Sequence, residues 1–233
     1  MKVIFVRHAD PCKDCYDITE DGRYAARKLR SELKKMNICH MYTGTILRTI
    51  ATGDILEETL RVPVDRQEWL NEFKHPIILP DQRQHYIWQI PPRFWADDAG
   101  LIGQDCLDEP MYKSGDISHF CLDIWDALDA LLASYGYVRK GNCYENHHRG
   151  SEAVILIVSH FATISVMLSH MLNLPLTVLM NSFWAAPASF TTLRTEEIEQ
   201  GTAIFRCIGY GETGYLSSDD SRRSFYGLQP EFQ

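Results

Sequence analysis

Two histidines in this chain each follow a short apolar run directly. His8 follows "VIFVR" and therefore has Arg7 beside it, whereas His160 follows "VILIVS". Runs of this length and composition are typical of buried strands, so both histidines are expected at the edge of a sheet. One such histidine is more often a hydrogen-bonded structural residue. Two of them at the ends of two strands, with an arginine beside one, are harder to explain as structural residues and favour a functional site at this edge.

Arg48 is a third candidate for this site. The segment "TGTILRTIAT" places it at the start of a helix that follows a short strand. Alone, it would be interpreted as a surface arginine. Beside two histidines it would supply a permanently charged, bidentate donor for an anionic group. The net charge of the chain is −8, so an anionic substrate requires such a local cluster of positive charge.

The composition narrows the function classes. The 233 residues are 45% hydrophobic and 23% charged, as in an ordinary globular protein. The acidic balance disfavours nucleic acids and anionic membranes as partners, and the apolar runs are too short to span a bilayer. The run at residues 3–6 is too short for a signal peptide, so we expect a cytoplasmic protein. The seven irregularly spaced cysteines indicate reduced thiols rather than a disulfide framework. The oligomeric state stays open, with a homodimer among the options.

Predicted strands and helices alternate along the chain. Strands are predicted at residues 3–6, 39–42 and 154–158, and helices at residues 20–36 with Thr19 as N-cap, Leu47–Leu60, residues 117–135 and Phe161–Leu172. This order predicts a three-layer α/β/α sandwich with a mostly parallel central sheet. Ligands of such sheets bind beyond the carboxyl ends of the strands. We expect a single domain over residues 1–233, with the proline-rich segment 74–115 as an irregular cap insertion.

Five segments occur together in the order and spacing of a known family. These are "VRHA", "ITEDGRYAA", "TGTILRTIAT", "LNEF" and "VSHFA". Together they resemble the histidine phosphatase superfamily, the phosphoglycerate mutase-like group. The resemblance extends over nearly the whole chain, because "ASFTTLR" and "GYGETGYL" resemble the late strands of that fold. It implies a phosphoglycerate mutase-like fold and an activity that needs no metal or other cofactor.

The resemblance also implies a role for each candidate residue. His8 matches the nucleophile that becomes a phosphohistidine, and Arg7, Arg48 and His160 match the pocket that holds the phosphoryl group. Glu72, in "LNEF", matches the general acid that protonates the leaving oxygen. Glu68, one helical turn earlier, is the rival candidate. Phosphoryl transfer depends on positioning and charge stabilisation, and a leaving alkoxide needs a proton. The implied function is a phosphatase that hydrolyses phosphomonoesters of a small molecule.

The chain departs from the family pattern in the residues that follow its two histidines. Ala9 stands where the family usually has glycine, which is a small change. Phe161 stands at the other glycine position, where a bulky side chain could narrow the pocket. The asparagine that commonly follows the first motif has no clear counterpart, because Asp10 and Asp14 are acidic. These departures concern rate and substrate.

Three alternatives to the phosphatase are open. A phosphoglycerate-type mutase would retain the phosphohistidine against water, but its longer basic and glycine-containing signatures are absent from this chain. A non-catalytic member would only bind a phosphorylated ligand, as Phe161 and the missing asparagine would allow. A metallohydrolase would use His8, Asp10 and the cysteines.

Weaker signals lie outside this core set. Cys12 and Cys15, in "CKDC", have the spacing of a metal or redox pair, and His147 and His148 lie in a polar stretch. The aromatic segment "HYIWQIPPRFW" either packs as a cap or selects the substrate. In the second case, the residues that would contact an organic group are Trp88, Arg93 and Trp95. The C-terminal "SRRSFYGLQPEF" either folds back over the site or forms a surface tail.

Overall fold

A mixed sheet of eight strands forms the centre of the molecule. The computed structural model describes residues 1–14, 17–73, 75–94, 96, 99–103, 105–146, 151–217 and 222–228. Within these residues the sheet has the order β3-β2-β8-β1-β9-β10-β7-β6. The strands are β1 Lys2–Arg7, β2 His40–Thr43, β3 Val64–Arg66, β6 Tyr137–Lys140, β7 Cys143–Asn146, β8 Val154–Ser159, β9 Phe190–Glu199 and β10 Thr202–Glu212. The neighbours β3, β2, β8 and β1 run parallel, and the remaining pairs are antiparallel. The parallel half is the half that ends on the two histidines.

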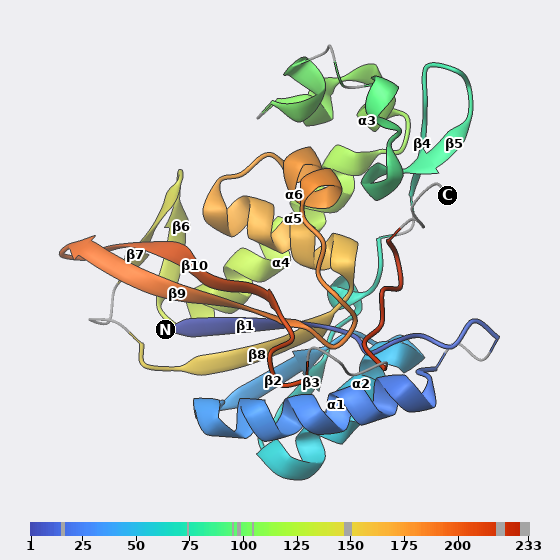
Figure 1. Cartoon of the computed structure of the whole chain (residues 1–233). Helices are drawn as coiled ribbons and strands as arrows, with labels where there is room; N and C mark the ends of the chain where they lie inside the picture. The colour runs from blue at the N-terminus through green and yellow to red at the C-terminus, as the bar shows by residue number, and fades with distance from the viewer. Residues whose placement is uncertain are drawn as a thin grey trace.

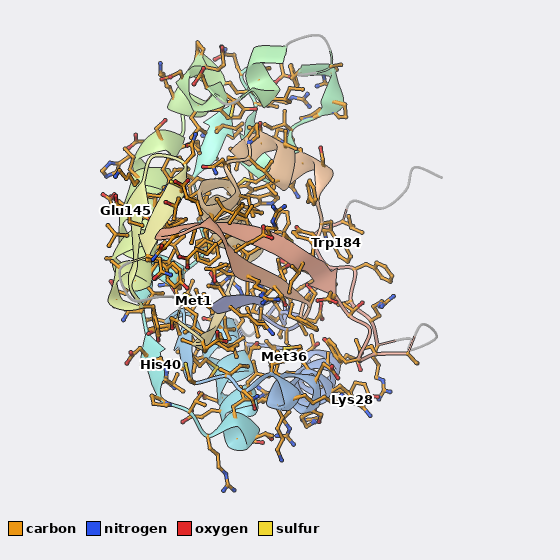
Figure 2. The ribbon with its side chains drawn as sticks, turned by 90° about the vertical axis from the view of Figure 1, so that its left-hand side faces the viewer. Met1, Lys28, Met36, His40, Glu145 and Trp184 are labelled. Carbon is orange, nitrogen blue, oxygen red and sulfur yellow. The ribbon has the colours of Figure 1, made fainter. Side chains whose placement is uncertain are left out.

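Helices cover both faces of the sheet (Figure 1). Helices α1 (Glu20–Leu33) and α2 (Leu47–Leu60) lie on one face, and α4 (Ile117–Ser134) and α5 (Phe161–Leu172) on the other. Successive residues of β1 point to opposite faces, so Val3 and Phe5 pack towards α4 and α5 while Ile4 and Val6 pack towards α1 and α2. Side chains fill the space on both sides (Figure 2). The predicted three-layer α/β/α architecture is confirmed.

The helix boundaries follow from local chemistry. Thr19 is the N-cap of α1, as predicted, because its Oγ1 accepts a hydrogen bond from Gly22 N at 2.9 Å. Helices α2 and α5 have the predicted bounds, and α4 ends one residue before the predicted end. Of the helices that the structure describes, each is too short or too polar to cross a membrane.

Several strands and one helix were not predicted from the sequence. The polar stretch after α4 forms the antiparallel hairpin β6–β7, with Gly141 at a φ of 57° in its two-residue turn. Only Tyr137 and Tyr144 bury large side chains there, so the apolar alternation is too sparse to reveal strands. The short β3 and the helix α6 (Leu176–Ser182) were missed as well. Of the two predicted late strands, "ASFTTLR" lies largely in β9, whereas β10 ends within "GYGETGYL".

The described residues of segment 74–115 form mostly short, irregular elements and lie over α5 and α6 (Figure 1). It contains a hairpin of β4 (Pro76–Ile78) and β5 (Gln84–Tyr86), several 3₁₀ turns and the short helix α3 (Pro110–Lys113). Ile77 and Ile87 are fully buried and join the core cluster that also contains α4 and α5. The insertion is therefore packed onto the main core on one side.

Candidate active site

The two histidines meet because their strands are parallel neighbours. Arg7 of β1 is in register with Ser159 of β8, and the backbone N of His8 donates to Ser159 O at 2.9 Å. His8 and His160 come next in each strand, and their ring centroids are 4.9 Å apart. Both side chains are buried. The pattern of apolar runs ending on histidine therefore predicted their meeting point correctly.

The surroundings of His8 hold its ring in one tautomer. Its Nδ1 lies 2.8 Å from Ala9 O, and a carbonyl can only accept, so Nδ1 carries the proton. Burial lowers the pKa of His8 well below its ordinary value, and the charges of Arg7 and Arg48 lower it further. The ring is therefore neutral at pH 7, with a lone pair on Nε2. A nucleophilic imidazole requires this state.

Arg48 binds between the two imidazoles. It lies in the first turn of α2, and its Nε donates towards His8 Nε2 at 3.3 Å and towards His160 Nδ1 at 3.2 Å. Its Nη2 is 4.0 Å from Glu72 Oε2. The guanidinium thus places a permanent positive charge next to the lone pair of His8.

Arg7 is almost completely buried at the same edge. Its Nη1 donates to Ala185 O at 2.6 Å and its Nη2 to Tyr226 O at 3.1 Å. Within the described residues its Nε, also buried, has no hydrogen-bond acceptor. Burial lowers the pKa of Arg7 to about 10, which leaves the side chain charged at neutral pH. The buried Nε–H of Arg7 therefore donates to no acceptor among the described residues.

Glu72, rather than Glu68, joins this group. The Oε2 of Glu72 lies 3.6 Å from His160 Nδ1, and its side chain is 17% exposed. Glu68 is exposed and does not line the cleft that contains the histidines. The backbone beside Glu72 is fixed to β8 and α5, since Ser159 Oγ donates to Leu70 O and Thr163 Oγ1 to Asn71 O, each at 2.7 Å. Glu72 therefore lies with the histidines and Arg48, and Glu68 does not.

Threonines of the "TGTILRTIAT" segment position the site and were missed in the sequence. Thr52 Oγ1 accepts from Ala9 N at 3.0 Å and donates to Arg48 O at 2.7 Å, so it joins the loop after His8 to the helix that carries Arg48. Thr45 exchanges hydrogen bonds with the side chain of Asn71, next to Glu72. The repeated threonines in the motif were the available signal.

His8, Glu72 and His160 lie close enough together to bind one metal ion. Their ligand atoms all lie within 4.8 Å of one another. However, the guanidinium of Arg48 lies against both rings, and its charge repels a metal ion while attracting an anion. Asp10 is used elsewhere, because Thr19 Oγ1 and Ser224 Oγ both donate to its carboxylate. The arrangement therefore suits an anion better than a metal.

Among the described residues, Cys12 and the other cysteines do not join this group. Cys12 lines the cleft and is disulfide-bonded, which differs from the expectation of reduced thiols throughout. Cys39, Cys106, Cys121, Cys143 and Cys207 are free, as expected. Cys15, His147 and His148 lie outside the described residues.

A cleft of about 1570 Å³ opens beside the two histidines. Arg7, His8, Arg48 and Glu72 line it on the sheet side. The insertion contributes Trp88, as one sequence hypothesis expected. Arg93 does not line the cleft but pairs with Asp81 at 3.1 Å, and Trp95 lies outside the described residues. The cleft is several times larger than a phosphate group requires.

The C-terminal segment closes one side of this cleft. Tyr226, Gly227 and Leu228 line it, and Ser224 ties the segment to the loop after His8 through Asp10. In Figure 1 the segment runs from the lower layer up towards the β4–β5 hairpin. For residues 222–228 the chain thus folds back over the site, which the sequence left undecided.

Phe161 lines the cleft at the start of α5, at the position where the resemblance led us to expect glycine. Its ring lies 5.6 Å from Arg7 Cζ, and the ring of Tyr226 lies 5.9 Å from the same atom. Both rings lie over the guanidinium of Arg7. Phe161 therefore shapes the wall beside Arg7 and leaves the His8–Arg48 contact intact.

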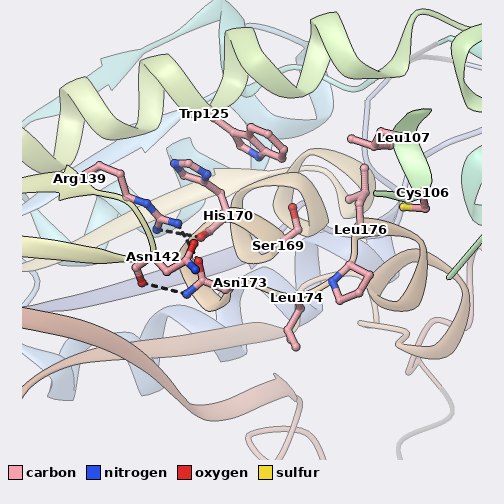
Figure 3. A pocket seen from close by; sticks show the side chains of 11 residues that line it. Cys106, Leu107, Trp125, Arg139, Asn142, Ser169, His170, Asn173, Leu174 and Leu176 are labelled. Atoms are coloured by element: carbon pink, nitrogen blue, oxygen red, sulfur yellow. Dashed lines mark hydrogen bonds between the residues drawn. The ribbon is translucent and has the colours of Figure 1, made fainter. Parts of the chain in front are cut away.

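A second, smaller pocket of about 370 Å³ lies away from these residues (Figure 3). His170 pairs there with Asp129 at 2.8 Å and stacks on Trp125. Arg139 donates to His170 O and to Asn173 Oδ1. The polar groups of this pocket thus bind one another, as in a structural network that joins α4, α5 and the β6–β7 hairpin.

A match to a protein family covers the first part of this site. Residues 3–98 match the model described as the histidine phosphatase superfamily (branch 1), and this range contains Arg7, His8, Arg48 and Glu72. The resemblance to the histidine phosphatase superfamily is confirmed. His160 lies beyond the matched range and completes the group in space. No curated protein matches the sequence.

Solved structures of phosphatases resemble this chain over most of its length. A mutant phosphoserine phosphatase from Entamoeba histolytica, in complex with phosphoserine, has a TM-score of 0.62 at 15% sequence identity, over 93% of this chain and 99% of that one. A mycobacterial glucosyl-3-phosphoglycerate phosphatase has a TM-score of 0.57 at 15% identity, over 90% of this chain and 98% of that one. At this identity the likeness concerns the fold, and it confirms the predicted fold class.

Proposed function

We propose that this chain is a metal-independent phosphatase that hydrolyses phosphomonoesters of a small molecule through a phosphohistidine on His8. The observation that carries the proposal is the neutral ring of His8, whose Nε2 lone pair faces a cluster of permanent positive charge. A phosphoryl group brings negative charge to that cluster, and a neutral imidazole is the nucleophile that can attack it. The named phosphatases among the structural neighbours support the same reaction class.

In the first step the phosphoryl group lies against Arg7, Arg48 and His160. The Nε of Arg7 has no acceptor among the described residues, so it is available to a phosphoryl oxygen. His8 Nε2 attacks phosphorus and forms a P–N bond while the ester P–O bond breaks. Glu72, in its protonated form, gives its proton to the leaving oxygen, which departs as an alcohol.

In the second step water attacks the phosphohistidine. The Glu72 carboxylate, left without its proton, accepts one from the water as the new P–O bond forms. The P–N bond breaks, His8 recovers its lone pair and inorganic phosphate leaves. The cycle balances without a metal, because the arginines provide the charge stabilisation throughout.

The non-catalytic alternative has one observation in its favour. Two guanidinium nitrogens of Arg7 already donate to Ala185 O and Tyr226 O, and the ring of Phe161 covers the same group. A protein that only binds a phosphorylated ligand would tolerate this arrangement. We rank it second, because binding alone does not require a nucleophilic tautomer of His8.

The compartment proposed for this activity is the cytoplasm. Cys39, Cys106, Cys121, Cys143 and Cys207 are free thiols, which is usual in a reducing compartment, and the disulfide at Cys12 is the exception.

Phosphate release from p-nitrophenyl phosphate in the presence of a chelator tests the proposed function. We expect turnover by the wild type and none above background by His8→Ala. Activity that disappears in chelator would favour the metallohydrolase. Strong stimulation by a bisphosphorylated glycerate would favour the mutase. Thermal stabilisation by phosphate without any turnover would favour the binding protein.

A further inference from the structure

The insertion contributes a flat aromatic wall to the active-site cleft. The rings of Tyr86 and Trp88 stack with centroids 4.7 Å apart and an interplanar angle of 4°. Tyr86 is 40% exposed, and Trp88 packs partly on the larger core cluster. Asn181 of α6 donates to Ile87 O at 3.0 Å, between the two aromatic residues. The wall is therefore held in place by both the core and α6.

A second group of apolar side chains lines the same cleft. Phe183 and Trp184 follow α6 directly, and Tyr226 and Leu228 come from the C-terminal segment. Phe183, Tyr226 and Leu228 are all between 40% and 49% exposed. Trp184, labelled in Figure 2, stacks on the ring of Phe225. So many exposed apolar rings around one cleft indicate a surface that binds an apolar group.

Charged groups are scarce along this surface. Among the lining residues that the structure describes, the carboxylate is Glu72 and the permanent cations are Arg7, Arg48 and Lys13. The phosphoryl group occupies the two arginines and the leaving oxygen occupies Glu72. Arg93, the nearby arginine of the insertion, is engaged by Asp81 and the ring of Phe94. An ammonium group on the substrate would thus find no described carboxylate beyond the catalytic one.

We propose that the cleft selects phosphomonoesters whose alcohol part is a flat aromatic or similarly apolar group, rather than an amino acid or a sugar acid. This inference rests on the proposed phosphatase activity. The cleft volume of about 1570 Å³ accommodates a group well above the size of glycerol. The stacked pair Tyr86–Trp88 provides the face on which a planar ring packs. The preferred substrate class therefore differs from phosphoserine, the ligand in a structural neighbour.

A comparison of esters with the same kind of leaving alcohol tests this inference. 2-(2-Naphthyl)ethyl phosphate, glycerol 1-phosphate and phosphoserine all release a primary aliphatic alcohol, so the leaving group does not favour the aromatic ester. We expect kcat/KM for the naphthylethyl ester to exceed that for glycerol 1-phosphate by roughly tenfold or more, since burying an aromatic group contributes that much discrimination. For phosphoserine we expect the lowest value.

Variants of the aromatic wall locate the selectivity. Tyr86→Ala and Phe183→Ala each truncate a ring that is 40% exposed, so neither change is expected to disturb folding. We expect each to lower the ratio of kcat/KM between the naphthylethyl ester and glycerol 1-phosphate by about threefold to tenfold. Ile198→Ala is the matched control, because Ile198 is 75% exposed on β9 and does not line the cleft. Its ratio should equal that of the wild type.

The possible outcomes separate the two claims. If phosphoserine is hydrolysed as efficiently as the naphthylethyl ester, or if the two truncations leave the ratio unchanged, the inference is wrong and the phosphatase stands. If the folded protein hydrolyses none of these esters and no p-nitrophenyl phosphate, both the proposed function and the inference are wrong.

Discussion

The Nε of Arg48 lies 3.3 Å from the Nε2 of His8, the atom that attacks phosphorus in the proposed reaction. A donor at that position is compatible only with a lone pair on Nε2. The opposite nitrogen of the ring lies 2.8 Å from Ala9 O, which fixes the proton there. The two contacts together orient the imidazole and define its protonation state before any substrate arrives.

Replacing Glu72 with glutamine should separate acid catalysis from binding. Glutamine keeps the shape of the side chain but cannot transfer a proton, so we expect kcat for alkyl phosphates to fall by roughly 10²- to 10⁴-fold. The loss should be smaller for p-nitrophenyl phosphate, whose leaving phenolate needs less protonation. Steady-state kinetics on both esters measure the difference.

Glu68→Gln is the matched control for that change. Glu68 lies one turn earlier in the sequence but is exposed and outside the cleft, so its variant should retain the activity of the wild type. Equal losses in both variants would refute the assignment of Glu72 as the acid.

Arg48→Lys should show that geometry as well as charge is required. Lysine keeps the positive charge but loses the Nε–H that contacts both His8 and His160, and the fork that could bind two phosphoryl oxygens. We expect kcat/KM to fall by roughly 10²-fold, the usual effect of removing one donor that stabilises a transition state. Arg66→Lys, at an exposed ion pair with Asp54, is the control and should be unaffected. Full activity of Arg48→Lys would contradict the proposed role.

Thr52 should act as a positioning residue. Thr52→Val removes the hydroxyl that accepts from Ala9 N and donates to Arg48 O, so a buried N–H loses its partner. We expect the free energy of unfolding to fall by about 1–3 kcal/mol, with a further loss of kcat and a partial rescue by Thr52→Ser.

Thr49→Val distinguishes this effect from simple destabilisation. The hydroxyl of Thr49 donates to Ile46 O within the same helical turn and does not contact the loop after His8. Its loss should lower stability while kcat stays near that of the wild type. If both variants lose activity in proportion to stability, Thr52 has no positioning role.

The buried neutral state of His8 should make stability depend on pH. Burial lowers the pKa of His8 in the folded protein, whereas the unfolded chain binds a proton near the ordinary value of about 6.5. Below that pH the unfolded state binds more protons than the folded state, so the free energy of unfolding falls as pH falls. The slope from this group is at most about 1.4 kcal/mol per pH unit.

His8→Asn should flatten that dependence. Thermal unfolding at pH 7.5 and pH 5 measures it, and the melting temperature of the variant should decrease less on acidification than that of the wild type. Identical decreases in the two proteins would mean that His8 is not held neutral by the fold.

The positions of the two histidines and of Arg48 were predicted from the sequence better than the positions of the residues around them. His8 and His160 were predicted to meet because each ends a buried strand, and parallel neighbours end at one edge of a sheet. Helix α2 was predicted to its exact bounds, and with it the place of Arg48. These positions depend on local patterns that the chain carries within a few residues.

Other features depend on contacts between distant segments. The position of Glu72 beside the histidines depends on Ser159 and Thr163, which bind the backbone next to it from 89 and 92 residues away. The carbonyl of Tyr226 reaches Arg7 across 219 residues. The β6–β7 hairpin buries too few apolar side chains to be predicted from alternation. None of these contacts leaves a periodic signal in the sequence.

Trapping the covalent intermediate tests the central claim most directly. Wild-type protein would be mixed with a ³²P-labelled phosphomonoester, quenched in alkali within milliseconds and digested for mapping. The account predicts a label that is stable in alkali and labile in acid, on the peptide that contains His8, and no label in His8→Ala. A wild-type enzyme that turns over without any such label, or a His8→Ala variant that retains its activity, would contradict it.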